Sequence, residues 1–227
     1  MKSSKFTSIL LIFGLLLFTS AVVTQLSEYL TEAVKVVYKN DGKTDKSISD
    51  DIRELLGTSN AYAGRDVALV LKVSGKAEVK SGSNNWESLN RGTRLHGGDQ
   101  VRTSDQTLVA LVFTDDKSML KIRSQSQVTI HGDRSKAGIK KRIDMGIGQL
   151  WAKVTKGGAG FRIETPTGVA AVKGTEFYVN LGLDGVMEVI GVEGLVQLGG
   201  RLGNVNVGAG QKGVLEKGKL PLLGQTK

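Results

Sequence analysis

The sequence lacks cysteine and has only two prolines, and aromatic residues make up 5% of its 227 residues. Without cysteine there can be no disulfides, thiolate metal sites, iron–sulfur clusters, cysteine nucleophiles or lipidated cysteine. Glycine, by contrast, occurs 30 times, much of it between short apolar runs. Because glycine tolerates positive φ in tight turns, this composition favours a domain of many short strands, stabilised by packing and backbone pairing.

Acidic residues are scarce in one part of the chain. The formal net charge is +9, and residues 117–162 contain eleven Lys and Arg but only two acidic residues, Asp133 and Asp144. That window carries the whole excess, so the rest of the chain is close to neutral. Such a concentration of positive charge is typical of a solvated surface or of a site that attracts an anionic partner.

The first 24 residues, MKSSKFTSILLIFGLLLFTSAVVT, are organised as an export signal. Two lysines precede an apolar run over residues 9–18, and small residues at 19–21 could be read by a signal peptidase. As a helix, residues 6–23 would span roughly 27 Å, close to the roughly 30 Å hydrocarbon core of a bilayer. Residues 1–24 are therefore expected to be a signal peptide or an uncleaved signal anchor. In both cases the rest of the chain is expected to be periplasmic or otherwise extracytoplasmic.

Residues 25–65 are expected to form a helical and flexible linker. Apolar residues at helical spacing over 25–38 predict a short amphipathic helix. The polar stretch 39–49 contains the turn signal Asn-Asp-Gly, and residues 50–56 could add two helical turns capped by Ser49.

From Asp66 onward the apolar residues recur with a period of two, which is typical of half-buried strands. The first strand is predicted over 67–73, and others at 107–113, 119–122, 128–131, 149–154, 161–164, 169–172, 176–181, 186–192, 195–198, 205–207 and 213–215. No helix-length periodic segment occurs in this region. The predicted fold is all-β, with many short strands in a sandwich, a roll or a β-solenoid-like arrangement, preceded by the two N-terminal helices. The β domain is expected to span residues 66–218, followed by a C-terminal tail at 219–227.

Three stretches of this region resemble the FecR family, named after periplasmic regulators of iron-transport signalling. The first contains Gly75, Val79, Trp86, Leu89, Gly92, Leu95, Gly98, Asp99, Val101 and Thr103. The second, and most specific, is FRIETPTGVAAVKGTEF over residues 161–177, and the third combines Val192, Gly194 and Val196 with Gly210 and Gln211. The resemblance implies a FecR-type periplasmic β domain. Because only about five residues precede the apolar run, it does not imply the cytoplasmic sigma-factor-binding segment of the regulators.

The residues of these stretches are interpreted as determinants of the fold. Gly98 with Asp99 and Gly174 with Thr175 are expected at turns and strand entries, where the polar side chain bonds nearby backbone. Pro166 is expected between strands, where its missing N–H does no harm. The aromatic residues are expected to be core anchors: Trp86, Trp151, Phe161 and Phe177.

Residue patterns for catalysis or cofactor binding are weak. His96 and His131 have no metal-ligand cluster around them and are interpreted as surface or turn residues. Gly208, Gly210 and Gly213 fit G-x-G-x-x-G, but a phosphate cradle needs a following helix, whereas here a short strand follows. We therefore expect no catalytic residues, no cofactor and no metal site, with an enzyme as the least favoured class.

The densest basic cluster lies in GDRSKAGIKKR, residues 132–142, which is interpreted as a loop. Either the loop is merely solvated, or its basic residues form a patch for an anionic partner: Arg134, Lys136, Lys140, Lys141 and Arg142.

The leading hypothesis is an exported bacterial envelope protein without enzymatic activity, which binds a protein or ligand or serves as a scaffold, with signalling as one context. The alternative is a basic-patch binder of an anionic envelope polymer or membrane surface. The expected partner is thus another envelope protein or an anionic wall or membrane component. Nucleic acid is disfavoured by the compartment and by the lack of aromatic residues among the charges.

Overall fold

A computed structural model describes residues 66–226. The expected leader (1–24) and linker (25–65), with both expected helices, lie outside the described residues. The described part is all-β, as predicted, and it contains no helix of the length and apolarity that a membrane span requires.

Within residues 66–226, seventeen strands form one continuous sheet with two halves, here named sheet A and sheet B. In sheet A the neighbours are, in order, β4 (Arg94–His96), β1 (Asp66–Ser74), β6 (Leu108–Phe113), β7 (Met119–Ile122), β9 (Gly138–Lys153), β12 (Glu176–Leu181), β13 (Met187–Glu193), β16 (Gln211–Leu215) and β17 (Leu222–Gln225). In sheet B they are β3 (Glu87–Ser88), β2 (Ala77–Lys80), β5 (Asp99–Thr103), β8 (Gln127–Ser135), β9 again, β10 (Phe161–Glu164), β11 (Val169–Val172), β14 (Val196–Gly200) and β15 (Gly203–Val207).

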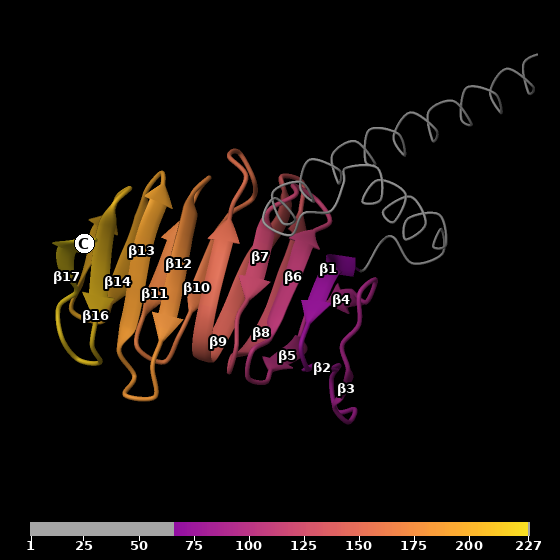
Figure 1. The fold of residues 1–227 in the computed structure, drawn as a ribbon. Helices are drawn as coiled ribbons and strands as arrows, with labels where there is room; N and C mark the ends of the chain where they lie inside the picture. The colour runs from indigo at the N-terminus through magenta and orange to yellow at the C-terminus, as the bar shows by residue number, and fades with distance from the viewer. Residues whose placement is uncertain (1–65, 227) are drawn as a thin grey trace, which may run out of the picture. The chain divides into compact units, whose positions relative to one another are not determined.

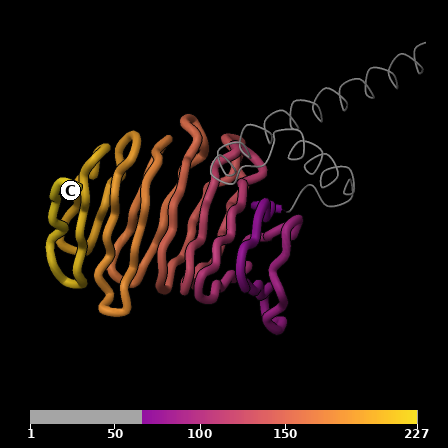
Figure 2. The backbone as a smooth tube through the Cα atoms, in the orientation of Figure 1, coloured from indigo at the N-terminus to yellow at the C-terminus, as the bar shows by residue number. Residues whose placement is uncertain are grey.

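Hairpins alternate between the two sheets along the chain. Hairpin β10–β11 lies in sheet B, β12–β13 in sheet A, β14–β15 in sheet B and β16–β17 in sheet A. The chain therefore advances steadily through a two-layered stack, from β1 at one end to β17 at the other (Figures 1 and 2).

Strand β9 joins the two sheets. Its first part, up to Ile147, pairs with β8 and β10 in sheet B, and from Gly148 onward it pairs with β7 and β12 in sheet A. Gly148 has a φ of +114°, and a Cβ at this position would lie 2.4 Å from Ser126 Cα. Only glycine fits such a corner without strain, so this residue fixes the place where the strand changes sheets.

The core fills the space between the sheets. Alternate residues of β9, among them Ile143, Met145 and Leu150, are buried in one apolar cluster with residues from both halves. At its centre Phe161 contacts two rings edge to face, Phe113 at 5.8 Å and Phe177 at 6.4 Å between centroids. Aromatic pairs prefer this geometry, which adds to the stabilisation from apolar burial.

The predicted strands at 119–122, 161–164, 169–172 and 176–181 have the same bounds as β7, β10, β11 and β12. The interpretation of GDRSKAGIKKR as a loop is wrong. Only Lys136 and Ala137 form a turn there, while the flanking residues pair as the β8–β9 hairpin. The expected C-terminal tail contains β17, which pairs with β16 and extends the sheet to Gln225.

Candidate functional site

The five residues of the predicted basic patch lie on different surfaces. Lys136 is exposed in the β8–β9 turn, and Arg134 donates a hydrogen bond to the backbone oxygen of Asp66 at 2.7 Å. Lys140 is exposed and Arg142 is half-buried on the outer face of sheet B, whereas Lys141 is only 2% exposed. Because side chains alternate between faces along a strand, these three consecutive residues cannot share one surface. The prediction therefore needs correction for Lys141.

The buried Lys141 side chain points inward and pairs with two aspartates of the β6–β7 turn. Its ammonium donates to Asp115 Oδ2 at 2.9 Å, to Asp116 Oδ2 at 2.6 Å and to the Ile139 carbonyl at 3.1 Å. The same ammonium lies 5.5 Å from the centroid of the Phe113 ring. All three ammonium protons have acceptors, so this lysine anchors the β6–β7 turn against β9 and is not available to a ligand.

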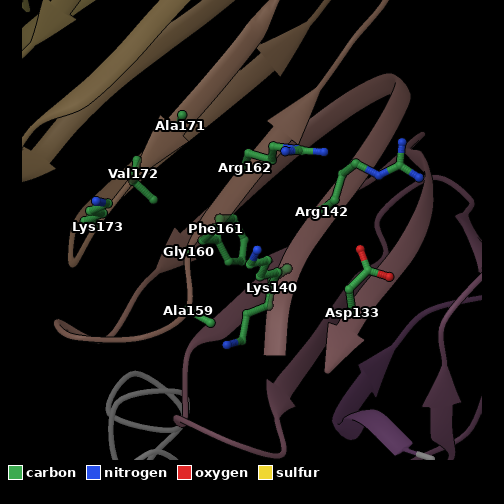
Figure 3. Close-up of a pocket in the computed structure, with 11 residues that line it drawn as sticks. Asp133, Lys140, Arg142, Ala159, Gly160, Phe161, Arg162, Ala171, Val172 and Lys173 are labelled. Atoms are coloured by element: carbon green, nitrogen blue, oxygen red, sulfur yellow. The ribbon is translucent and has the colours of Figure 1, made fainter. Parts of the chain in front are cut away.

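A pocket of about 230 Å³ lies on the outer face of sheet B, across β9, β10 and β11. Five cationic residues line it: Lys140, Lys141 and Arg142 of β9, Arg162 of β10, and Lys173, which follows β11. The Lys141 side chain is turned inward, so four cationic side chains remain on the outer face. Gly160, Ala159 and Ala171 leave its floor open, and Asp133 is its one acidic lining residue. Figure 3 shows the two arginines extending from neighbouring strands, with Lys140 and Lys173 on either side of Phe161.

The two arginines are neighbours on adjacent strands. Arg142 of β9 and Arg162 of β10 are direct partners in the parallel ladder, so their side chains leave the sheet side by side. Like charges in directly opposite positions destabilise a sheet. Glu164 lowers this cost, since its carboxylate pairs with Arg162 at 2.6 Å and with Arg142 at 3.4 Å.

The carboxylates that contact these guanidiniums do not line the pocket. Asp144 lies 3.5 Å from Arg142 and also contacts His131 Nε2 at 2.8 Å, and both Asp144 and Glu164 line a separate hollow nearer Pro166. Lys140 and Lys173 form no ion pair with any residue in the range 66–226. On the outer face of sheet B the charges are thus separated along the strands: positive at the pocket and negative at the hollow nearer Pro166.

Arg162 and Lys173 were not recognised as site residues from the sequence. Each lies about 20 to 30 residues from the basic cluster, and only the pairing of β9 with β10 and of β10 with β11 brings them to it. A partial signal exists in the alternation of Ile139, Ile143 and Met145 with polar neighbours, which indicates a strand and assigns Lys140 and Arg142 to one face.

The polar residues of the FecR-like stretches bond nearby backbone. Asp99 is buried, and its Oδ2 accepts a hydrogen bond from the His96 N–H at 2.8 Å. Gly98 has a φ of +98° directly before β5. Gly174 has a φ of +81°, and a Cβ there would lie 2.8 Å from Lys156 Cα. Buried Thr175 donates from its hydroxyl to the Leu195 carbonyl at 3.1 Å.

The aromatic residues have three kinds of environment. Phe161 and Phe177 belong to the core, whereas Trp151 is buried on the outer face of sheet A, beneath the Lys121 ammonium at 4.5 Å. Trp86 is half-buried outside the core, and the Arg102 guanidinium stacks on its ring at 4.2 Å. The expectation of a core anchor is therefore wrong for Trp86, because the strand it precedes, β3, lies at the edge of sheet B.

Pro166 is exposed in the turn between β10 and β11, which is closed by a hydrogen bond from the Thr165 N–H to the Gly168 carbonyl at 2.9 Å. The missing N–H of this proline interrupts no ladder.

Both histidines contact carboxylates. Besides the His131–Asp144 contact, His96 Nε2 lies 3.2 Å from Asp66 Oδ1, whose carboxylate also pairs with Arg94 at 2.6 Å. Over residues 66–226, no three His, Asp or Glu side chains are grouped so that they could hold a metal ion.

Two pKa shifts concern other parts of the domain. The hydrogen bond from Arg102 lowers the pKa of the Glu78 carboxyl below 4.5. Burial lowers the pKa of the Lys117 ammonium, which follows Asp115 and Asp116 in the β6–β7 turn.

Comparison with known proteins gives a family match and similar solved structures, among them two structural neighbours. Both neighbours are solved structures from Parabacteroides distasonis titled "putative anti-sigma factor". The first has 13% identity and a TM-score of 0.48, covering 56% of this chain and 59% of its own. The second has 15% identity and a TM-score of 0.43, covering 48% of this chain and 52% of its own. The matched region thus spans little more than half the length of those chains, and no curated protein matches the sequence. The family model described as FecR protein matches residues 99–197, from β5 into β14, which confirms the resemblance to the FecR family over these residues.

Proposed function

We propose that this chain is an exported FecR-type envelope protein that acts without catalysis, as a binding or scaffold module in signalling or regulation. The observation that carries the proposal is the FecR family match over residues 99–197. Proteins built on one fold can differ in activity, so the assignment of a role depends on what the surface of this domain can bind.

The arrangement of charged residues supports a binding role. Lys141 and its two aspartates stabilise the fold, and Asp99 bonds the backbone of its own turn. The remaining concentration of charge lies in the open pocket on the outer face of sheet B, where no general base contacts a nucleophile. Such a surface on a rigid sheet is suited to recognition.

Export is part of the same proposal. The basic start and apolar run of residues 1–24 support a signal peptide or signal anchor that places the β domain in the periplasm or another extracytoplasmic space. Cell fractionation combined with N-terminal sequencing of the purified protein tests this. Recovery of the full chain in the cytosolic fraction would contradict export.

The binding role is tested by crosslinking in intact envelopes, followed by affinity capture and identification of the attached molecules. We expect a reproducible partner with the native chain. Capture at background level in all conditions would contradict the proposal. The variant Lys140→Gln/Lys173→Gln reports whether the pocket contributes, and Lys76→Gln/Lys217→Gln removes the same charge from exposed positions elsewhere.

A second function is supported by the pocket itself. The four cations around it favour binding of an anionic envelope polymer or membrane surface. Such binding should weaken with salt, because the Debye length falls from about 10 Å at 0.1 M to about 3 Å at 1 M. Retention on wall or membrane material that is independent of salt would argue against this function.

A further inference from the structure

The pocket on the outer face of sheet B has more cations than its surroundings neutralise. Apart from Lys141, whose ammonium is held by Asp115 and Asp116, four cationic residues line it, and the only carboxylate among the lining residues is Asp133. Lys140 and Lys173 form no ion pair with any of residues 66–226, and both are exposed. Selection for stability alone does not lead to such a cluster, because each added like charge in one place is unfavourable.

The floor of the pocket is made of small residues. Ala171 of β11 is the ladder partner of Arg162, and no side-chain atoms beyond its Cβ compete for the space beside the guanidinium. Gly160 and Ala159 lie next to Lys140 on the other side (Figure 3). A compact group can therefore reach the ladder between Arg142 and Arg162, with the two lysines at its flanks.

The donor set favours a phosphoryl group. A guanidinium offers a rigid fork of N–H donors and an ammonium offers three donors, and residues of both kinds line this one pocket. A single carboxylate has two oxygens in one plane and one negative charge. A phosphate monoester or pyrophosphate has more oxygens, in several directions, and two or more charges, so it can engage all four cations.

A flat anionic bilayer fits this face less well. Asp133, Asp144 and Glu164 lie on the same outer face within one or two residues of the cations along the strands. An extended negative surface would meet these carboxylates together with the cations. A single anionic group entering the pocket would avoid them.

We propose that this pocket binds one phosphoryl group of two or more charges, as the recognised part of an envelope component. The proposal rests on the binding function proposed above and names its ligand chemistry. Lys140 and Lys173 supply ammonium donors at the flanks of the pocket, and Arg142 and Arg162, whose guanidiniums pair with Glu164, supply further donors beside it.

The test is calorimetric titration of the full chain with inorganic pyrophosphate at low and high salt. We expect saturable binding to one site, weakened by about tenfold or more in Lys140→Gln/Lys173→Gln, since hydrogen bonds to charged groups contribute strongly. Neither substitution breaks an ion pair within residues 66–226, so the fold should persist, and the melting temperature checks this.

Lys76→Gln/Lys217→Gln is the matched control, because it removes two exposed charges outside the pocket. Equal weakening in both double variants would show a diffuse charge effect and overturn the proposal. Absence of saturable binding to the native chain would also overturn it. Citrate serves as a carboxylate competitor, and affinity equal to that of pyrophosphate would refute the preference for a phosphoryl group.

Vesicles of phosphatidylcholine with and without phosphatidic acid distinguish a lipid headgroup from a soluble source of the same group. If the ligand is a lipid headgroup, phosphatidic acid should increase vesicle binding of the native chain more than vesicle binding of Lys140→Gln/Lys173→Gln.

Failure of the site and failure of the proposed function can be told apart. If crosslinking captures a partner equally with native chain and variant, and pyrophosphate does not bind, the site is refuted while the function stands. If pyrophosphate binds in the pocket but no partner is captured, the function is refuted.

Discussion

The outer faces of the two sheets organise their charged residues differently. On sheet A, Lys153 of β9 pairs with Glu176 of β12 at 3.2 Å, and Lys212 of β16 pairs with Glu188 of β13. Each of these lysines has its carboxylate on the adjacent strand. Lys121 covers the Trp151 ring, so a large aromatic surface is shielded as well.

On sheet B the same kinds of side chain are sorted by sign. Lys140, Arg142, Arg162 and Lys173 gather at the pocket, while Asp144 and Glu164 lie further along the same strands. Near β2 and β5 the face of sheet B is neutral again, with Glu78 paired to Arg102 at 2.7 Å. The comparison shows that the basic residues form a candidate site only where strand pairing places cationic side chains next to each other.

The largest expected effect concerns the corner that joins the two faces. In Gly148→Ala the new Cβ would lie 2.4 Å from Ser126 Cα, at a φ of +114°. Strain and overpacking together should lower the free energy of unfolding by about 4 kcal/mol, measured by urea denaturation. Gly146→Ala is the control two residues away, where the nearest atom would be Gln127 O at 3.8 Å, and a change below about 1 kcal/mol is expected. Similar losses in both variants would contradict the assignment of the corner to Gly148.

The next largest effect should be a difference in the free energy of unfolding between substitutions on the inner and on the outer face of β9. Lys141→Met leaves Asp115 and Asp116 close together without their cation, and we expect a loss of about 3 kcal/mol in the free energy of unfolding. Lys140→Met, one residue earlier on the exposed face, should change it by less than about 0.5 kcal/mol. Equal losses from the two substitutions, again by urea denaturation, would refute the division of roles.

Glu164→Gln should increase the net positive charge on the outer face of sheet B near the pocket. It removes the carboxylate that pairs with Arg142 and Arg162, so Arg162 becomes available to an anion while Arg142 keeps only its contact with Asp144 at 3.5 Å. We expect pyrophosphate affinity to rise about two- to fivefold in calorimetry, in keeping with the small free energy of exposed ion pairs. Glu176→Gln, which breaks the Lys153 pair on sheet A, should leave the affinity unchanged. A decrease with Glu164→Gln would mean that this carboxylate orients the arginines for the ligand.

The smallest effect should come from the neutral end of sheet B. Because Arg102 donates a hydrogen bond to Glu78, the pKa of this carboxyl is lower in the folded state than its ordinary 4.5. Such a group stabilises the fold above its unfolded pKa, and the contribution is lost as pH falls below 4.5 through the folded pKa. The melting temperature of Glu78→Gln should therefore be slightly below that of the native chain near neutral pH, and the gap should close in acid. Glu87→Gln, on the exposed strand β3, should show no such trend.

Most of the strands could be predicted from local pattern, because side chains alternate between a solvent-exposed and a buried face every two residues. The bounds of β7, β10, β11 and β12 were predictable for this reason. The segment around Lys140 was not recognised as strand because basic residues occupy both of its faces. A lysine at an inward position is seldom fully buried, and only the two aspartates of a turn 25 residues away make it stable there.

By itself the sequence determined the class of the fold, the FecR-type motifs and the concentration of positive charge between residues 117 and 162. All of these depend on local composition and order. The tertiary structure decided which cations meet: it placed Arg162 and Lys173 beside Lys140 and Arg142 and turned Lys141 into the core. Strand pairing joins residues far apart in the chain, and its register assigns each side chain to a face, so neither can be derived from any single segment.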